Sequence, residues 1–507
     1  MRERRRGAKW VASVIAAGVT VTLAVTGCTA NEDASASAQQ AAAFPEVYAQ
    51  TIDWGVCDES YDLSEGFAEV LDSRGVAVDS YECSMIDAPY DWNDPENGET
   101  IELATVRVPS TGDDAPLGTL LGNPGGPGAS GLMHAFSMPA APGMAEVLDN
   151  YDLLGFDPRG IGRSTPTECV AQSSITELNL ALCAAEAPIA LTMGTSQVAR
   201  DMELLRSLMG DDSMHYLGYS YGTVLGATYS TLFPEKVGRM VLDSAIPSNW
   251  ASPMGSFNQN LAIVREADAL LAGCGELYEA SACPLTDEES ISTVMELLAV
   301  DPITTSDGGE VTSSTLFGYV INALYQPTAG REFALETLAA ALAQDQDSID
   351  AIALDMADGG SNVDLNGTLV KCHSFPTDPQ LPELVDYITE VGIPVALGGP
   401  EINDDSLRQW MDLACDALPN SGDDITDTFS GSPDAPILVI GLLSDHTTPY
   451  AGSQKLVEEL GNATLLTLDS VGHGGSYAAK SHCVDDYTTT YLLTGELPAE
   501  GTVCTIG

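Results

Sequence analysis

The chain has 507 residues, with 19 Lys and Arg against 74 Asp and Glu, for a net charge of −55. Such acidity argues against nucleic-acid binding, which needs a basic surface, and against electrostatic docking on anionic lipid. At 44% hydrophobic residues, the chain can bury the core of one large domain with an insertion, or of two domains. The charge favours solubility, and an alternative role is to attract substrates that carry a positively charged N-terminal amine.

The first residues form a targeting segment outside the fold. Basic residues between Arg2 and Lys9 precede an apolar run over 10–25, which is short for a membrane span and has the length of a signal-peptide core. The run ends in Val25-Thr26-Gly27-Cys28, which resembles a bacterial lipobox. We therefore predict a lipoprotein signal peptide over 1–27 and lipidation of Cys28; an ordinary secretory signal cut nearby is the alternative.

Residues 28–44 are small and polar, which predicts a flexible tether between the lipid and the folded domain. The sequence holds no second long apolar span. We therefore expect a secreted protein, or one held at the extracellular face of the cell membrane through its lipid anchor only.

Ten cysteines remain after Cys28, and an even number on an exported chain predicts disulfides. The sequence contains no C-x-x-C pair and no Cys/His cluster that would suggest a metal site. The simplest connectivity joins neighbours in the sequence, although other pairings stay open. These neighbouring pairs are Cys57–Cys83, Cys169–Cys183, Cys274–Cys283, Cys372–Cys415 and Cys483–Cys504.

Strand and helix patterns alternate between residue 100 and residue 249. This alternation predicts an α/β fold with a mostly parallel sheet covered on both faces. Strands are expected over 101–108, 117–121, 151–156, 214–217 and 239–242, and helices over 197–209 and 223–233.

From 250 to 430 the pattern is mostly helical, with loops rich in Asp, Gly, Ser and Pro. Strands return at 436–442 and 463–468, and a last helix is expected near 485–493. The simplest organisation is one α/β core in two parts, 45–249 and 431–507, with 250–430 inserted as a helical cap over the sheet.

The segment Gly218-Tyr219-Ser220-Tyr221-Gly222 has the G-x-S-x-G pattern of a nucleophile elbow. The pattern alone is weak, but here an expected strand precedes it and an expected helix follows it, as the elbow requires. Flanking glycines permit the tight turn that presents the serine hydroxyl at the sheet edge. We therefore predict an α/β-hydrolase fold with Ser220 as nucleophile.

A serine nucleophile needs a base, and an acid that orients the base. In this fold the chain order is Ser, acid, His. His473 lies between glycines directly after the last core strand, and Asp445 follows the strand before it. These two residues are predicted to complete the triad, with Asp243 as the rival acid.

The glycine-rich segment Asn123-Pro124-Gly125-Gly126-Pro127-Gly128 follows the strand over 117–121. Backbone N–H groups of such a loop can stabilise an oxyanion. The predicted donors are Gly126, or alternatively Gly125, and Tyr221, the residue after the nucleophile. A phosphate-binding loop is the competing interpretation, but the Gly-Lys-Ser/Thr ending is missing.

These motifs, with Asp157-Pro158-Arg159-Gly160-Ile161-Gly162-Arg163-Ser164 and the C-terminal Gly495-Glu496-Leu497-Pro498, resemble the actinobacterial tripeptidyl aminopeptidases with their TAP-like C-terminal region, exported relatives of proline iminopeptidases. The resemblance runs from about residue 54 to the end. It implies release of tripeptides from peptide substrates with a free N-terminus, without a cofactor. An exported carboxylesterase or lipase with the same triad is the alternative, and a solute-binding lipoprotein is the non-enzyme alternative.

Overall fold

The computed structural model describes residues 35–170, 172–173, 175–274, 291–300, 302–358, 365–375, 381–399, 413–419 and 428–507. The predicted signal peptide, Cys28 and Cys283 lie outside these ranges. No helix in the described ranges is both long and apolar enough to cross a membrane.

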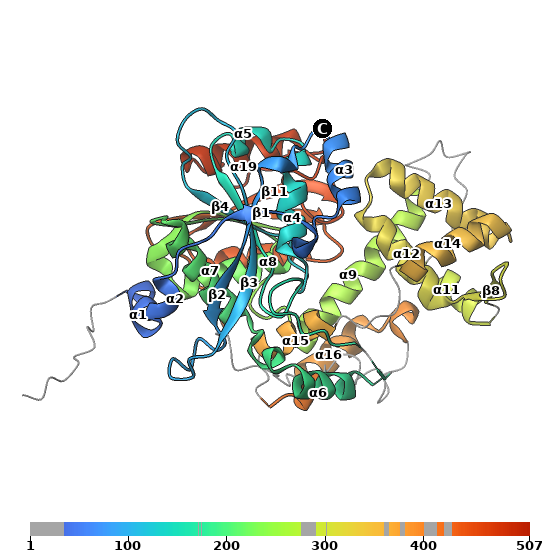
Figure 1. Cartoon of the computed structure of the whole chain (residues 1–507). Helices are drawn as coiled ribbons and strands as arrows, with labels where there is room; N and C mark the ends of the chain where they lie inside the picture. Colours follow the sequence, from blue (N-terminus) through green and yellow to red (C-terminus); the bar gives the residue numbers. More distant parts are fainter. Residues whose placement is uncertain are drawn as a thin grey trace, which may run out of the picture.

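A large twisted sheet forms the centre of the α/β part of the molecule (Figure 1). Its first three strands are antiparallel, β3 is also antiparallel to β5, and all later neighbours are parallel. The fold is therefore an α/β hydrolase with a mostly parallel sheet, as predicted. In spatial order the strands are β1 (Gly55–Val56), β2 (Glu82–Pro89), β3 (Thr100–Val108), β5 (Asp152–Phe156), β4 (Thr119–Asn123), β6 (Met214–Tyr219), β7 (Val237–Asp243), β10 (Ile437–Ser444), β11 (Ala463–Val471) and β12 (Val503–Thr505).

Helices cover both faces of this sheet, and the strand sequences explain why. Successive side chains point to opposite faces, so Tyr216 packs into one core and its neighbour Leu217 into the other. Both faces are apolar because a parallel sheet is buried on both sides. One face packs on α7 (Thr195–Met209), α8 (Tyr221–Leu232) and α18 (Tyr450–Leu460), and the other on α3 (Glu65–Ser73), α4 (Gly131–Ser137), α5 (Ala145–Leu148) and α19 (His482–Thr494).

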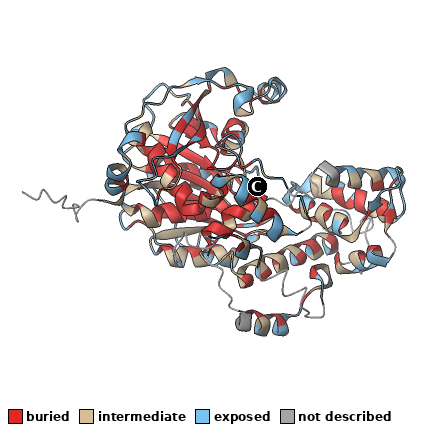
Figure 2. Cartoon of the chain, turned by 60° about the horizontal axis from the view of Figure 1, so that its bottom comes forward, coloured by how far each residue is buried: buried red, intermediate tan, exposed pale blue. Residues whose placement is uncertain are grey.

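The described parts of 250–430 are mainly helical, and most of them form a third core beside the sheet domain (Figures 1 and 2). The helix over Leu365–Ser374 instead packs its apolar residues into the core on one face of the sheet. Figure 2 shows buried residues on the inward faces of these helices. We call this part the cap; its elements are α9 (Pro253–Ala272), α11 (Ile291–Val300), the β8–β9 hairpin (Ile303–Thr304 and Glu310–Val311), α12 (Ser313–Tyr325), α13 (Thr328–Leu342), α14 (Gln346–Asp358), α15 (Leu365–Ser374) and α16 (Leu381–Val391).

The prediction of a flexible tether over 28–44 is wrong for its second half. Residues Ala36–Ala43 form helix α1, which the Ser35 side chain caps by accepting the Ala38 N–H at 3.3 Å. Gln40 is buried, and its amide donates to the Arg200 carbonyl of α7 at 3.0 Å. The small polar composition that suggested flexibility also suits a helix once a neighbouring surface buries one side of it.

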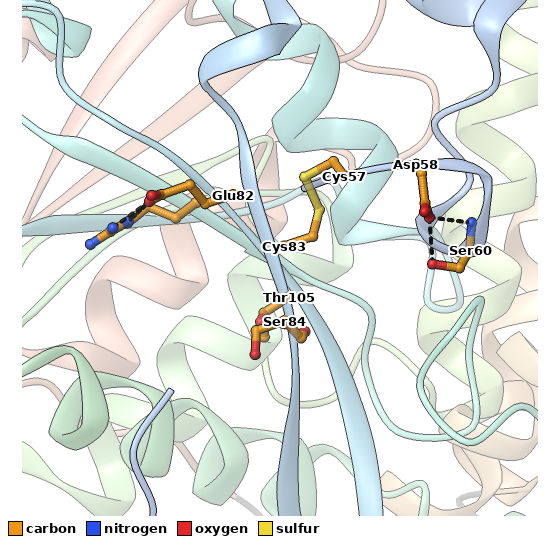
Figure 3. The surroundings of a disulfide bond; sticks show 8 residues. Cys57, Asp58, Ser60, Glu82, Cys83, Ser84 and Thr105 are labelled. Carbon is orange, nitrogen blue, oxygen red and sulfur yellow. Dashed lines mark hydrogen bonds and ion pairs between the residues drawn. A yellow bond between two sulfur atoms is a disulfide. The ribbon is translucent and has the colours of Figure 1, made fainter. Parts of the chain in front are cut away.

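Four of the expected cysteine pairs are disulfides: Cys57–Cys83, Cys169–Cys183, Cys372–Cys415 and Cys483–Cys504. Cys274 is also disulfide-bonded. Figure 3 shows the first bridge, which ties the end of β1 to β2. Beside it, the Thr105 hydroxyl of β3 donates to the Ser84 carbonyl of β2 at 2.8 Å.

Candidate active site

Ser220 lies between the last residue of β6 and the first residue of α8. Its φ of 54° and ψ of −124° are values that residues with side chains rarely adopt, so the turn is strained. A β-carbon on Gly218 would lie 2.6 Å from the carbonyl oxygen of Gly222, which explains the glycine there. The turn is the predicted elbow, at the C-terminal end of β6.

His473 and Asp445 lie on the loops that follow β11 and β10, and they are in direct contact. The Nδ1 atom of His473 is 3.0 Å from both carboxylate oxygens of Asp445, which is fully buried. The carboxylate also accepts the Thr447 and Thr448 N–H groups at 2.9 and 2.8 Å, and the Thr448 hydroxyl at 2.9 Å.

This environment keeps the carboxylate charged. Burial raises the pKa of Asp445, but the charge of His473 and the hydrogen bonds outweigh burial, so the pKa is lowered below its usual value. An ionised carboxylate only accepts hydrogen bonds, so it holds the His473 proton on Nδ1 and leaves Nε2 as the basic nitrogen.

Asp243, the rival acid, has a different set of partners. Its buried carboxylate accepts the Gly475 N–H at 2.9 Å, and the Ser476 N–H and hydroxyl at 2.6 Å each. Burial raises the pKa of Asp243, which the hydrogen bonds from Ser476 oppose. Asp243 therefore anchors the loop that carries His473, and the imidazole is bonded to Asp445 instead.

The order of the strands in the sheet brings the loops that carry Ser220, Asp445 and His473 together. β7 lies between β6 and β10, and its last residue, Asp243, accepts the Ser220 N–H through its carbonyl at 2.9 Å. The same residue holds the His473 loop through its side chain. The side-chain hydrogen bonds of His473 in the described structure run from Nδ1 to Asp445 and Thr448, and none reaches the Ser220 hydroxyl. Such contacts are often long before a substrate binds.

The glycine-rich loop after β4 packs directly on the elbow. A β-carbon on Gly125 would lie 3.0 Å from the Tyr221 nitrogen and 3.0 Å from the Ser220 β-carbon. The Gly125 N–H donates to the Asn123 side chain at 2.9 Å, whereas the described hydrogen bonds include none from the Gly126 N–H. Of the two glycines left open by the sequence, Gly126 is thus the one whose N–H has no described hydrogen bond, and the other predicted donor, Tyr221, is the first residue of α8.

Sequence reasoning missed Lys480. Its ammonium donates to the carbonyls of His473 and Gly474 at 2.7 and 2.9 Å. Burial lowers the pKa of Lys480, and the nearby carboxylates of Asp243 and Asp445 oppose this shift. A single lysine on a surface loop gives no sequence signal, because its role depends on carbonyls that only the folded loop presents.

The described residues contain no group of three or more His, Cys, Asp or Glu side chains that could hold a metal ion. The groups gathered at the site are the Ser220 hydroxyl, the His473 imidazole, the Asp445 carboxylate and backbone N–H donors. A strained serine at a strand–helix turn, above a mostly parallel sheet and beside a His–Asp pair, defines the class of serine hydrolases with the α/β-hydrolase fold.

Comparison with known proteins agrees with this class. A family model described as alpha/beta hydrolase fold matches residues 118–267, and one described as TAP-like protein matches 403–504. The tripeptidyl aminopeptidase of Streptomyces coelicolor is 28% identical over 487 residues, which cover 89% of this chain and 86% of that protein.

Two mycobacterial proteins are similar over nearly the same span. Serine protease Hip1 of Mycobacterium tuberculosis is 27% identical and covers 83% of this chain and 87% of its own length. Carboxylesterase B of the same organism is 30% identical, with 83% of this chain and 86% of that protein covered. The chain belongs to the tripeptidyl aminopeptidase family of α/β hydrolases.

Proposed function

We propose that this protein is an exported serine aminopeptidase that releases tripeptides from free N-termini through a Ser220–His473–Asp445 acyl-enzyme mechanism. The observation that carries the proposal is the His473–Asp445 contact at 3.0 Å, on a loop anchored beside the Ser220 elbow. Relatives named tripeptidyl aminopeptidase and serine protease support the peptide substrate.

In the first half of the mechanism, His473 Nε2 takes the Ser220 proton as the hydroxyl oxygen attacks the carbonyl carbon of the scissile bond. The Gly126 and Tyr221 N–H groups hold the oxyanion that develops. Asp445 stabilises the imidazolium, which then protonates the leaving amine. In the second half, His473 deprotonates water, which attacks the acyl-enzyme and releases the peptide acid and free Ser220.

Export and lipid anchoring through Cys28 belong to the proposal. The basic and apolar N-terminal segment and the lipobox-like sequence support them. The disulfides support them independently, because such bridges persist in oxidising compartments outside the cytosol. Mass spectrometry of the membrane-bound protein tests them: an N-terminal diacylglyceryl-modified Cys28 is expected, and an unmodified terminus at another residue would contradict the anchor.

The catalytic assignment is tested by labelling with a fluorophosphonate, which reacts with an activated serine of either a peptidase or an esterase. Wild-type protein should be labelled at Ser220, and Ser220→Ala and His473→Ala should each abolish labelling without unfolding the protein. His482→Ala is the matched control, because His482 is exposed on α19, nine residues further on. Labelling of the Ser220→Ala protein would refute the assignment.

An esterase is the second candidate, and the 30% identity to carboxylesterase B favours it. A tripeptide anilide with a free amine, its N-acetylated twin and a short-chain p-nitrophenyl ester separate the two functions. The aminopeptidase proposal requires strong preference for the free amine over its acetylated twin. Equal rates on both anilides, or hydrolysis of the ester alone, would contradict it.

A further inference from the structure

His446 is an unusual residue next to the proposed catalytic acid. Its side chain is fully buried, and neither ring nitrogen has a hydrogen-bond partner among the residues that the structure describes. Buried polar groups are nearly always paired, because an unpaired one is destabilising. A residue that weakens the fold at this place needs an explanation in terms of the site.

Tyr325, the last residue of cap helix α12, packs on His446. The two ring centroids are 4.4 Å apart with an interplanar angle of 81°, an edge-to-face contact. The Tyr325 hydroxyl is 2.8 Å from the Thr447 hydroxyl, which holds the ring on the Asp445–Thr448 loop. We call Tyr325 and His446 the aromatic wall.

Both rings of the aromatic wall lie beside the His473 imidazole. The Tyr325 centroid is 6.0 Å from that of His473 at 89°, and the His446 centroid is 6.4 Å away at 68°. The wall therefore supports the imidazole from the side of the cap, while the Asp445 carboxylate binds its Nδ1 atom.

The wall is uncharged at neutral pH. Burial lowers the pKa of His446 to about 4; Asp445 opposes the shift, and the neighbouring His473 and Lys480 add to it. Burial also raises the pKa of the Tyr325 phenol. The wall thus lies beside His473 without adding a charge that competes with Asp445.

Two further contacts join the cap to the same loops. The Gln259 side chain of α9 donates to the Thr447 carbonyl at 2.7 Å. A β-carbon on Gly472, directly before His473, would lie 3.3 Å from the Leu324 carbonyl oxygen of α12, so the cap approaches the His473 loop closely.

We propose that Tyr325 and His446 are positioning residues that hold the His473 imidazole in its reactive orientation, so that seating of the cap completes the catalytic base. The proposal rests on the Ser220–His473–Asp445 assignment. It makes the cap part of the catalytic machinery, in addition to any part it takes in substrate binding. It also explains why the His446 ring is buried without a hydrogen-bond partner: the ring supplies a flat surface that supports the His473 imidazole.

The test compares truncated and ring-preserving variants in the full chain: Tyr325→Ala and Tyr325→Phe, and His446→Ala and His446→Phe. Phe333→Ala is the control, because it removes an aromatic ring that is 66% exposed on cap helix α13. The fluorophosphonate labelling rate is measured for each protein, together with kcat and KM on the best substrate and the thermal midpoint.

Both alanine variants should lower the labelling rate and kcat by about tenfold, with KM changed by less than about twofold, because the base and not the substrate loses support. Both phenylalanine variants should stay within about threefold of wild type, since the ring is retained. Phe333→Ala should match wild type.

A folded His446→Phe protein that is slowed as much as His446→Ala would overturn the proposal, because the ring nitrogens would then be the active feature. A raised KM with unchanged kcat in the variants would also overturn it, since the wall would then contact substrate only. If an alanine variant fails to fold, the phenylalanine variant of that position still tests whether the ring alone supports the reaction rate. Failure of wild-type labelling at Ser220 would instead refute the catalytic assignment.

Discussion

The sharpest stability prediction concerns Asp243→Ala. The change removes an acceptor that serves three buried donors, the Gly475 N–H and the N–H and hydroxyl of Ser476. Hydrogen bonds to a charged group contribute about 1.5–3 kcal/mol each, which sets an upper limit of roughly 5–9 kcal/mol. The variant no longer buries a carboxylate and its loop can relax toward water, so we expect a net loss of roughly 3–5 kcal/mol.

The same change should slow catalysis although Asp243 does not touch the imidazole. The loop that it anchors carries His473, and a displacement of about 1 Å at a reacting group can cost about 100-fold in rate. Urea unfolding gives the stability change, and kcat on the preferred substrate gives the catalytic change. Asp469→Ala is the matched control, because Asp469 is an exposed acidic residue on strand β11 of the same sheet.

Two results would refute this reasoning. If Asp243→Ala loses less than about 1 kcal/mol, the hydrogen bonds of the buried carboxylate do not hold the loop. If it keeps wild-type stability but loses all labelling of Ser220, Asp243 is a catalytic acid and the assignment of Asp445 is wrong.

Three further predictions follow from other contacts. Asn123→Ala should lower kcat by about 10- to 100-fold with little change in KM, because it releases the Gly125 N–H that orders the oxyanion loop; steady-state kinetics would show this. Stability should fall as the pH drops from about 6.5 to about 4, because the unfolded chain protonates His446 at its ordinary pKa of 6.5 while the folded protein protonates it only near 4. This one residue accounts for roughly 3 kcal/mol of that loss, and urea unfolding of His446→Phe across this range should show a shallower slope. Replacing Cys57 and Cys83 together by serine should cost about 3–4 kcal/mol through the less constrained unfolded chain, measured by thermal or urea unfolding.

Each of these has an outcome that contradicts it. Wild-type kcat in Asn123→Ala would mean that the order of the glycine-rich loop does not contribute to stabilising the oxyanion. An unchanged pH slope in His446→Phe would mean that His446 titrates normally in the folded protein. Equal stability of the serine double variant and wild type would show that strand pairing alone secures the N-terminal edge of the sheet.

Local sequence patterns were sufficient for the chemistry of the site. The glycines around Ser220 are needed by the turn itself, since a β-carbon at either position would meet backbone or side-chain atoms within 3 Å. The buried strand before Asp445 and the glycine-flanked loop of His473 are equally visible in the sequence, because each depends on residues within about ten positions.

The N-terminal part of the chain was harder to predict. Strand β2, over Glu82–Pro89, lies near the edge of the sheet and lacks the long apolar run of the central strands. Helix α1 is rich in alanine and capped by Ser35, and Gln40 fixes it to the domain by donating to the Arg200 carbonyl of α7 and to the Tyr48 hydroxyl. A helix of eight residues is marginal in isolation even when it is rich in alanine, so packing on the domain stabilises it.

The sequence by itself determined which residue types carry the chemistry and in what order they follow along the chain, because turns and buried strands are short-range features. The sequence favoured Asp445 over Asp243 and Gly126 over Gly125, and the tertiary structure added the contacts: the imidazole is bonded to Asp445, Asp243 binds the His473 loop, and the Gly125 N–H is bonded to Asn123. The tertiary structure also placed Tyr325 against His446. The contact of Asp243 with the His473 loop and that of Tyr325 with His446 join positions more than a hundred residues apart, and the packing of the sheet and cap sets them.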